Sequence, residues 1–255
     1  MLKPAVPTSI VVLFLRSLGF AVGTILLLVI GSLAVLLAFP LSFERRYHIS
    51  QPWNGFVIWW LRKTCKIDYR LSGLEHIPPG PTIVVAKHQS AWETIFLQQF
   101  LPPLAWVVKR ELLWIPFFGW ALALLHPIAI DRKATTFALK QVIRQGQERL
   151  AQGQWVLIFP EGTRTAPGSR QPYAASGALL AVNTGYPILP IAHNAGELWP
   201  RRGFFKYPGT IDLVFGPLIT PSGRPAKVLN ALVEQWIEST MQRISRVPEQ
   251  PAENK

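Results

Sequence analysis

The chain carries a series of short apolar runs, each bounded by glycine, proline or polar residues. Continuous apolar runs of about four to eight residues are typical of strands that are buried on both faces, as parallel strands are. We therefore expect strands at residues 82–86, 104–108, 127–130, 155–159, 188–193 and 210–215.

Two longer segments carry apolar residues at helical spacing. Residues 134–152 and residues 226–246 each place apolar side chains along one face of a helix, and the second stripe runs from Leu229 to Ile244. Strands that alternate with helices predict an α/β fold with an open, mostly parallel sheet flanked by helices. In such folds the active residues lie at the carboxyl ends of strands.

The N-terminal part has a different pattern, because residues 17–43 contain no charged side chain. As a helix this segment would be roughly 40 Å long, which exceeds a hydrocarbon core of about 30 Å. It can span a bilayer with tilt or lie deep in one leaflet. A signal peptide is the alternative, but the apolar run is too long and lacks a small-x-small cleavage site. We predict a retained, membrane-embedded helical anchor.

The remaining chain divides at changes in composition. Pro40 is expected to end the first helix, and residues 52–66 predict a second, amphipathic helix at the membrane interface. An α/β domain is expected over residues 67–246. Residues 247–255, which are mostly polar and include two prolines, predict a flexible tail.

The net charge of +12 calls for an anionic partner. Nucleic acid is one candidate, but the chain has no basic helix or groove-binding motif. Basic residues interleaved with aromatic residues fit an anionic lipid surface better, and they occur at residues 59–63 and 201–207. Ordinary solvated charge clusters beside core aromatics are the alternative. We predict membrane lipids, and no nucleic acid, as partners.

The positions of the charges also predict an orientation. Arg45, Arg46, Arg62 and Lys63 follow the apolar segment, whereas two basic residues precede it. This bias places the α/β domain on the cytoplasmic face of the cell's inner membrane. The single cysteine, Cys65, excludes an internal disulfide and agrees with a reducing compartment.

A histidine follows the first of the predicted strands. His88 comes two residues after the run at residues 82–86, and a carboxylate, Glu93, follows five residues later. An imidazole titrates near neutrality, and a carboxylate that binds its second nitrogen makes it a general base. The pattern therefore predicts that His88 and Glu93 are catalytic.

A second motif follows the run at residues 155–159. It holds Glu161, Gly162, Thr163 and Arg164. A glycine-bearing turn with an arginine suits a phosphate group, which binds backbone donors and a planar guanidinium. A base that faces an anion site indicates deprotonation of a hydroxyl on a phosphorylated substrate.

These motifs resemble the 1-acyl-glycerol-3-phosphate acyltransferase (PlsC-like) family of glycerolipid acyltransferases. That family carries four blocks, which match residues 88–93, 128–132, 159–164 and 189–191 in order. The order and spacing fit from about residue 70 to 220. Position 93 departs from the family pattern, because the chain has Glu where Asp is usual.

The resemblance implies a reaction without an enzyme nucleophile. His88 would deprotonate the sn-2 hydroxyl of lysophosphatidate, which would attack acyl-CoA or acyl-carrier protein directly. These thioesters are co-substrates, and we expect no cofactor and no metal. Donors for the tetrahedral oxyanion would come from backbone amides around Gly162 or from Lys109.

The family's phosphate block implies roles for the second motif. Arg164 would bind the acceptor phosphate, Thr163 belongs to the same block, and Glu161 would orient donors, since a carboxylate cannot help to bind an anion. Arg132 and Lys109 are further phosphate candidates. A local ion pair with Asp131 is the alternative for Arg132.

Other interpretations stay open from the sequence. Ser90 and Glu93 also fit a capping box at the start of a helix. The apolar residues 112–120 could guide an acyl chain, rest on the bilayer or pack in the core. The acceptor could be another lysolipid such as a lyso-ornithine lipid, or the chain could be a catalytically silent membrane-surface adaptor. A metallohydrolase fits worse, because His88 and Glu93 lack the His-Glu-x-x-His spacing.

Overall fold

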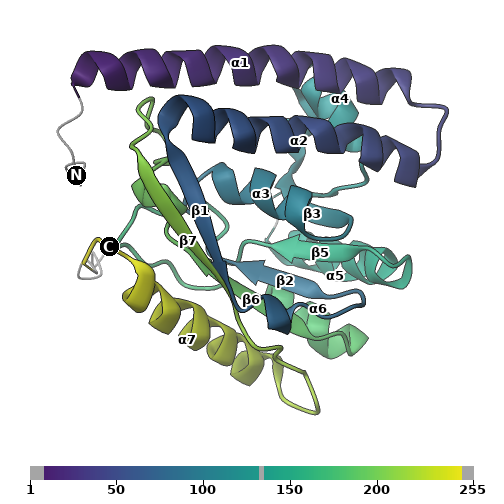
Figure 1. The fold of residues 1–255 in the computed structure, drawn as a ribbon. Coiled ribbons are helices and arrows are strands. Elements are labelled where there is room, and N and C mark those ends of the chain that lie inside the picture. The colour runs from purple at the N-terminus through teal and green to yellow at the C-terminus, as the bar shows by residue number, and fades with distance from the viewer. Residues whose placement is uncertain (1–8, 132–134, 249–255) are drawn as a thin grey trace.

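The computed structural model describes residues 9–131 and 135–248. A seven-stranded sheet forms the centre of the molecule, with helices on both faces (Figure 1). The helices are α1 (Ile10–Leu37), α2 (Phe43–Cys65), α3 (Trp92–Phe100), α4 (Phe118–Ala123), α5 (Thr135–Ala151), α6 (Ser176–Thr184) and α7 (Ala226–Ile244), with 3-10 turns η1 (Leu74–His76), η2 (Arg110–Trp114) and η3 (Ala195–Glu197). The strands are β1 (Ile67–Ser72), β2 (Ile83–Ala86), β3 (Leu104–Lys109), β4 (Ile128–Ile130), β5 (Trp155–Ile158), β6 (Ile188–His193) and β7 (Gly209–Phe215).

The sheet has the strand order β1-β7-β6-β2-β5-β3-β4. Every neighbouring pair is parallel except β6 and β7. The prediction of an open, mostly parallel sheet flanked by helices is therefore confirmed, as are the six predicted strands. The edge strand β1 was not predicted, because Asp68 and Arg70 interrupt its short apolar pattern.

The two faces of the sheet are covered by separate apolar layers. Along β2, Val84 and Ala86 pack on the α2 and α3 side, whereas Ile83 and Val85 pack on the α5, α6 and α7 side. Alternate side chains of a strand point to opposite faces, so a strand that is apolar at every position must be covered twice. This burial fixes β2 in the middle of the molecule and positions the loop that follows it.

The two N-terminal helices depart from their predicted bounds. Helix α1 ends at Leu37, before Pro40 as expected, but it begins at Ile10 and includes Arg16, which the charge-free criterion had excluded. Helix α2 begins at Phe43 and continues through Pro52, where we expected a helix start. Packing of α2 against α1 and α3 outweighs the local cost of one proline inside a helix.

Helix α2 packs on the protein core with one face. Its residues Val57, Ile58 and Leu61 are buried in the protein core. Helix α1 lies along the outer side of α2 (Figure 1). Amphipathic spacing shows that one face needs an apolar cover, but it does not distinguish protein from lipid.

Helix α1 is bound to the domain by specific contacts and leaves an apolar face uncovered. Trp60 Nε1 donates to the carbonyl of Gly19 at 3.1 Å, and the amide of Lys206 donates to Oγ of the buried Ser17 at 3.0 Å. Within the described part of the chain, α1 is the one helix long and apolar enough to cross a membrane. Its outward side chains, including Ile25 and Ile30, are exposed.

Candidate active site

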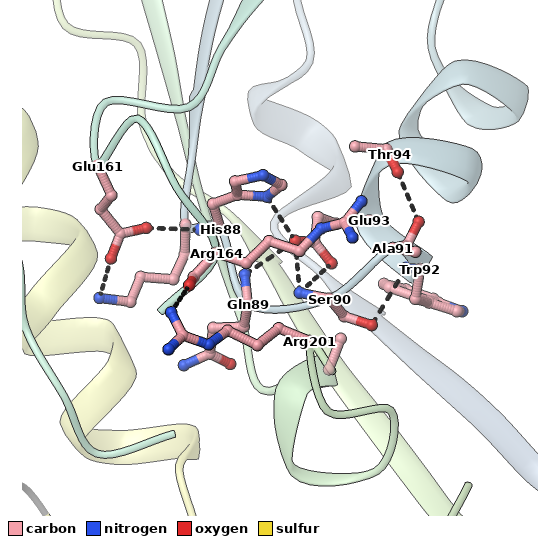
Figure 2. A network of polar contacts seen from close by, with 12 residues as sticks. His88, Gln89, Ser90, Ala91, Trp92, Glu93, Thr94, Glu161, Arg164 and Arg201 are labelled. Carbon is pink, nitrogen blue, oxygen red and sulfur yellow. Dashed lines mark hydrogen bonds and ion pairs between the residues drawn. The ribbon is translucent and has the colours of Figure 1, made fainter. Parts of the chain in front are cut away.

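The candidate site lies where central strands of the sheet end in loops (Figure 2). His88 follows β2 in the loop that leads to α3, and the turn after β5 carries Glu161 and Arg164. Strands β2 and β5 are parallel neighbours, so their carboxyl ends lie at the same edge of the sheet. The two motifs found in the sequence therefore meet in space.

The imidazole of His88 is held by a carboxylate and by an aromatic ring. Its Nδ1 lies 2.9 Å from Oε1 of Glu93, and its ring stacks on Phe159 with the centroids 4.0 Å apart. An ionised carboxylate can only accept a hydrogen bond, so Nδ1 carries the hydrogen and Nε2 carries the lone pair. This tautomer makes Nε2 the atom that can accept a proton from a bound molecule.

Glu93 is fully buried at the start of α3. Besides Nδ1 of His88, its carboxylate accepts from the amide of Gln89 at 2.9 Å and from the amide of Ser90 at 2.8 Å (Figure 2). Burial by itself would raise the pKa of Glu93, but His193, His88 and the Ser90 amide together lower that pKa below its ordinary value. Glu93 is therefore the ionised partner that a histidine base requires.

The same carboxylate also takes part in hydrogen bonds that resemble a capping box just before α3. Oγ of Ser90 accepts from the amide of Trp92 at 3.2 Å, while the carboxylate of Glu93 accepts from the amide of Ser90. The two sequence interpretations of Glu93 are therefore compatible. The first turn of a helix also favours a negative charge, which agrees with an ionised Glu93.

The main chain of His88 is fixed by the turn after β5. Oε2 of Glu161 accepts from the amide of His88 at 2.7 Å, and the amide of Thr165 donates to the carbonyl of His88 at 2.8 Å. Glu161 is buried, which raises its pKa, although the ammonium of Lys87 at 2.7 Å opposes this effect. We expected Glu161 to orient donors, and the donor that it contacts is the backbone amide of His88.

A cationic cleft of about 240 Å³ opens beside His88. Its lining consists of His88, Thr163, Arg164, Arg201 and Arg202. The guanidinium of Arg201 donates to the carbonyl of Arg164 and so joins the two loops (Figure 2). Several guanidinium groups around one imidazole make a site suited to a phosphate group.

Gly162 gives the turn its shape rather than a free donor. Its backbone has a φ of 66°, in the left-handed region that favours glycine. Its amide donates to the carbonyl of Phe159 at 3.1 Å. The Gly162 amide that we considered for an oxyanion is therefore used within the turn.

Of the two remaining predicted residues, the structure describes only Lys109. Lys109 is exposed at the end of β3, and β5 separates that strand from β2. Lys109 does not line the cleft beside His88. Arg132 lies outside the described residues.

A second histidine, His193, was not singled out in the sequence. It is fully buried at the end of β6, the other neighbour of β2. Its Nε2 donates to the carbonyl of Lys87 at 2.7 Å, and its Nδ1 accepts from the amide of Ala195 at 3.3 Å. Burial lowers the pKa of His193, although the carboxylate of Glu93 opposes this effect. Its position at the end of a predicted strand was the signal that could have identified it.

Sequence reasoning also missed three basic residues. Arg201 and Arg202 were assigned to a lipid-facing cluster, because no local pattern shows that their loop folds back beside His88. Lys87 was passed over, although it is 1% exposed. A lysine at the end of an apolar run has no sequence signal for burial, since its carboxylate partners come from distant segments.

Comparisons with known proteins show that the chain is similar to acyltransferases. The family model described as "Acyltransferase" matches residues 68–194. The chain is 51% identical to the 1-acyl-sn-glycerol-3-phosphate acyltransferase of Pseudomonas aeruginosa, over 85% of this chain and 86% of that protein. It is 39% identical to the mouse 1-acyl-sn-glycerol-3-phosphate acyltransferase alpha, over 66% and 60% of the two chains. The fold is that of the Thermotoga maritima acyltransferase PlsC, with a TM-score of 0.76, 24% identity, and coverage of 92% and 97%.

Proposed function

Since this chain belongs to the 1-acyl-sn-glycerol-3-phosphate acyltransferase family, we propose that it acylates the sn-2 hydroxyl of 1-acyl-glycerol-3-phosphate. The acyl group comes from acyl-CoA or acyl-carrier protein, and the product, phosphatidate, enters phospholipid synthesis. The observation that carries this proposal is the hydrogen bond from His88 Nδ1 to the ionised Glu93, at the edge of a cleft that holds Arg164.

The chemistry follows from the tautomer of His88. The acceptor hydroxyl donates its proton to Nε2 while its oxygen attacks the carbonyl carbon of the thioester. The tetrahedral intermediate then collapses, the C–S bond breaks, and the thiolate takes the proton from the imidazolium. Glu93 stabilises the positive charge that the imidazole carries between these two steps.

The cationic cleft holds the phosphate of the acceptor. Arg164 from one loop and Arg201 and Arg202 from another surround it, and Thr163 adds a hydroxyl donor. Binding the phosphate beside the imidazole places the rest of the glycerol chain, including its free hydroxyl, within reach of His88. Such positioning makes a bimolecular reaction effectively unimolecular.

We propose that the protein binds membrane lipids and takes its acceptor from the membrane. The loop that carries Arg201 and Arg202 is attached to α1, because Phe204 packs on Phe14 and the amide of Lys206 donates to Ser17. Helix α1 covers α2 along its length, so we propose that it lies in one leaflet rather than crossing the bilayer. Trp114 is also exposed, and we propose that the domain faces the cytoplasm at the inner membrane.

Arg164→Lys should impair the response to lysophosphatidate. Lysine keeps the charge but loses the planar, bidentate guanidinium that matches a phosphate group. We expect KM for lysophosphatidate to rise by about tenfold, which corresponds to about 1.4 kcal/mol of acceptor binding. Steady-state rates at varied acceptor concentration measure this change. Unchanged kcat and KM would contradict a phosphate-binding role for Arg164 and would assign that role to Arg201 and Arg202.

An assay of the purified protein with a panel of acceptors tests the function itself. The panel contains lysophosphatidate and a lyso-ornithine lipid, each with labelled acyl-CoA or labelled acyl-carrier protein. We expect transfer to lysophosphatidate, since only this acceptor has a phosphate for the cationic cleft. A preference for the lyso-ornithine lipid would show that the acceptor is not lysophosphatidate. The absence of transfer to any lysolipid would favour a catalytically silent adaptor.

A further inference from the structure

A group of buried charged side chains lies next to His88 in the protein interior. The ammonium of Lys87 lies 2.7 Å from Oε1 of Glu161 and 2.9 Å from Oε1 of Glu238. Glu161 belongs to the turn after β5, and Glu238 belongs to α7, 151 residues away from Lys87 in the chain. The ammonium is therefore fixed between carboxylates from two separate segments.

The group is hydrogen-bonded beyond the two ion pairs. Tyr173 donates from its hydroxyl to Oε1 of Glu238 at 2.8 Å, and Thr165 Oγ1 lies 3.1 Å from Oε1 of Glu161. Burial, together with the nearby Glu161 and Glu238, raises the pKa of Tyr173, so it remains a neutral donor. Buried charges are tolerated only when their polar atoms are satisfied in this way.

This group contacts the peptide unit that joins Lys87 to His88. The amide of His88 donates to Glu161 Oε2 at 2.7 Å, and the carbonyl of Lys87 accepts from His193 Nε2 at 2.7 Å. Both polar atoms of that peptide are thus held by buried side chains. The position of His88 then depends on the position of Glu161, and Lys87 fixes the carboxylate of Glu161.

We propose that Glu238 on α7 is a positioning residue for His88, acting through Lys87 and Glu161. This proposal rests on the function proposed above. Glu238 does not touch the substrate side, because it does not line the cleft that holds Arg164, Arg201 and Arg202. It acts by keeping the ammonium of Lys87 between two carboxylates. The carboxylate of Glu161 then keeps its hydrogen bond with the amide of His88.

A second cleft, of about 360 Å³, lies beside this group of buried charges. Its lining includes Lys87, Gln89, Arg170 and Glu238. Without the charge at position 238, Lys87 would have a single carboxylate partner, so its ammonium would be held from one side only. A shift of about 1 Å in a reacting group can cost about 10²-fold in rate. Loss of the charge should therefore change turnover more than substrate binding.

Glu238→Gln tests the proposal with little change of shape. Its amide oxygen can still accept from Tyr173 and Lys87, so the variant removes mainly the charge. We expect kcat to fall by about 10–100-fold, with KM for lysophosphatidate within about twofold of wild type. Glu238→Asp keeps a carboxylate and should recover part of kcat. Glu234→Gln, on the same helix and without an ion pair to Lys87, is the matched control and should leave kcat unchanged.

Nitrogen-15 NMR of the imidazole gives a readout that does not depend on activity. The His88 resonances are identified by their loss in His88→Ala. They should shift in Glu238→Gln and stay in place in Glu234→Gln. Thermal midpoints show which variants are folded, and Glu238→Asp serves as the test if Glu238→Gln does not fold.

The outcomes separate the two proposals. A wild-type protein that acylates no lysolipid overturns the proposed function, and the NMR comparison still decides the role of Glu238. An active wild type with unchanged kcat and unmoved His88 resonances in Glu238→Gln overturns the positioning role. A lower thermal midpoint alone, with kcat and resonances intact, also overturns it, because it would show a purely structural ion pair.

Discussion

Replacing His88 with alanine should lower turnover by about 10²–10⁴-fold, the usual contribution of a general base. The imidazole is the proton acceptor at the edge of the cationic cleft, and Nε2 is its atom with a lone pair. The variant keeps Arg164, Arg201 and Arg202, so lysophosphatidate should still bind. The measurement is kcat for phosphatidate formation with saturating lysophosphatidate and acyl thioester.

Membrane association of the same variant is the control. His88 lies in the loop after β2, and the contacts that attach α1 to the domain include those of Trp60 and Lys206. The His88→Ala protein should therefore sediment with vesicles as wild type does. A folded variant with wild-type turnover would exclude His88 as the base.

Glu93→Gln should lower kcat by a similar factor, on the order of 10²–10⁴. A neutral amide does not stabilise the imidazolium that forms when His88 takes a proton. The carboxylate also accepts from the amides of Gln89 and Ser90, and a glutamine oxygen can keep most of these bonds. The variant should therefore stay folded while turnover is lost, which kcat and the thermal midpoint measure together.

Two related variants separate the catalytic role of Glu93 from its role in the capping box. Glu93→Asp should keep substantial activity, because Asp is usual in the family at this position and remains a carboxylate. Ser90→Ala removes the Oγ that accepts from the amide of Trp92, and it should cost about 0.5–2 kcal/mol of stability while kcat is retained. A fully active Glu93→Gln protein would show that Glu93 only closes the capping box.

The sheet could be predicted because its inner strands are apolar at every position. Strands such as β2 and β5 are buried on both faces, so their sequences carry the signal without knowledge of their partners. The edge strand β1 and the short helix α6 lack such a signal, since each is defined by its contacts with neighbouring elements. The bounds of α1 were wrong because a charged residue, Arg16, is part of a helix that we began after it.

The site was predictable to the extent that its residues are close in sequence. His88 and Glu93 are five residues apart, and the spacing already placed an acid beside the base. Lys87, His193 and Glu238 could not be linked in the same way, because their contacts join three elements that are distant in the chain. For the same reason, the loop with Arg201 and Arg202 was interpreted as a lipid-facing cluster.

A rapid-quench experiment with stoichiometric protein and labelled acyl thioester tests the central claim most directly. Direct attack by the acceptor predicts that the enzyme itself carries no covalent acyl label at any time. It also predicts label in phosphatidate only when lysophosphatidate is added. The same mixture with the His88→Ala protein should form phosphatidate slower by about 10²–10⁴-fold. An acyl-protein that forms before phosphatidate, or a wild-type rate without His88, would contradict the account.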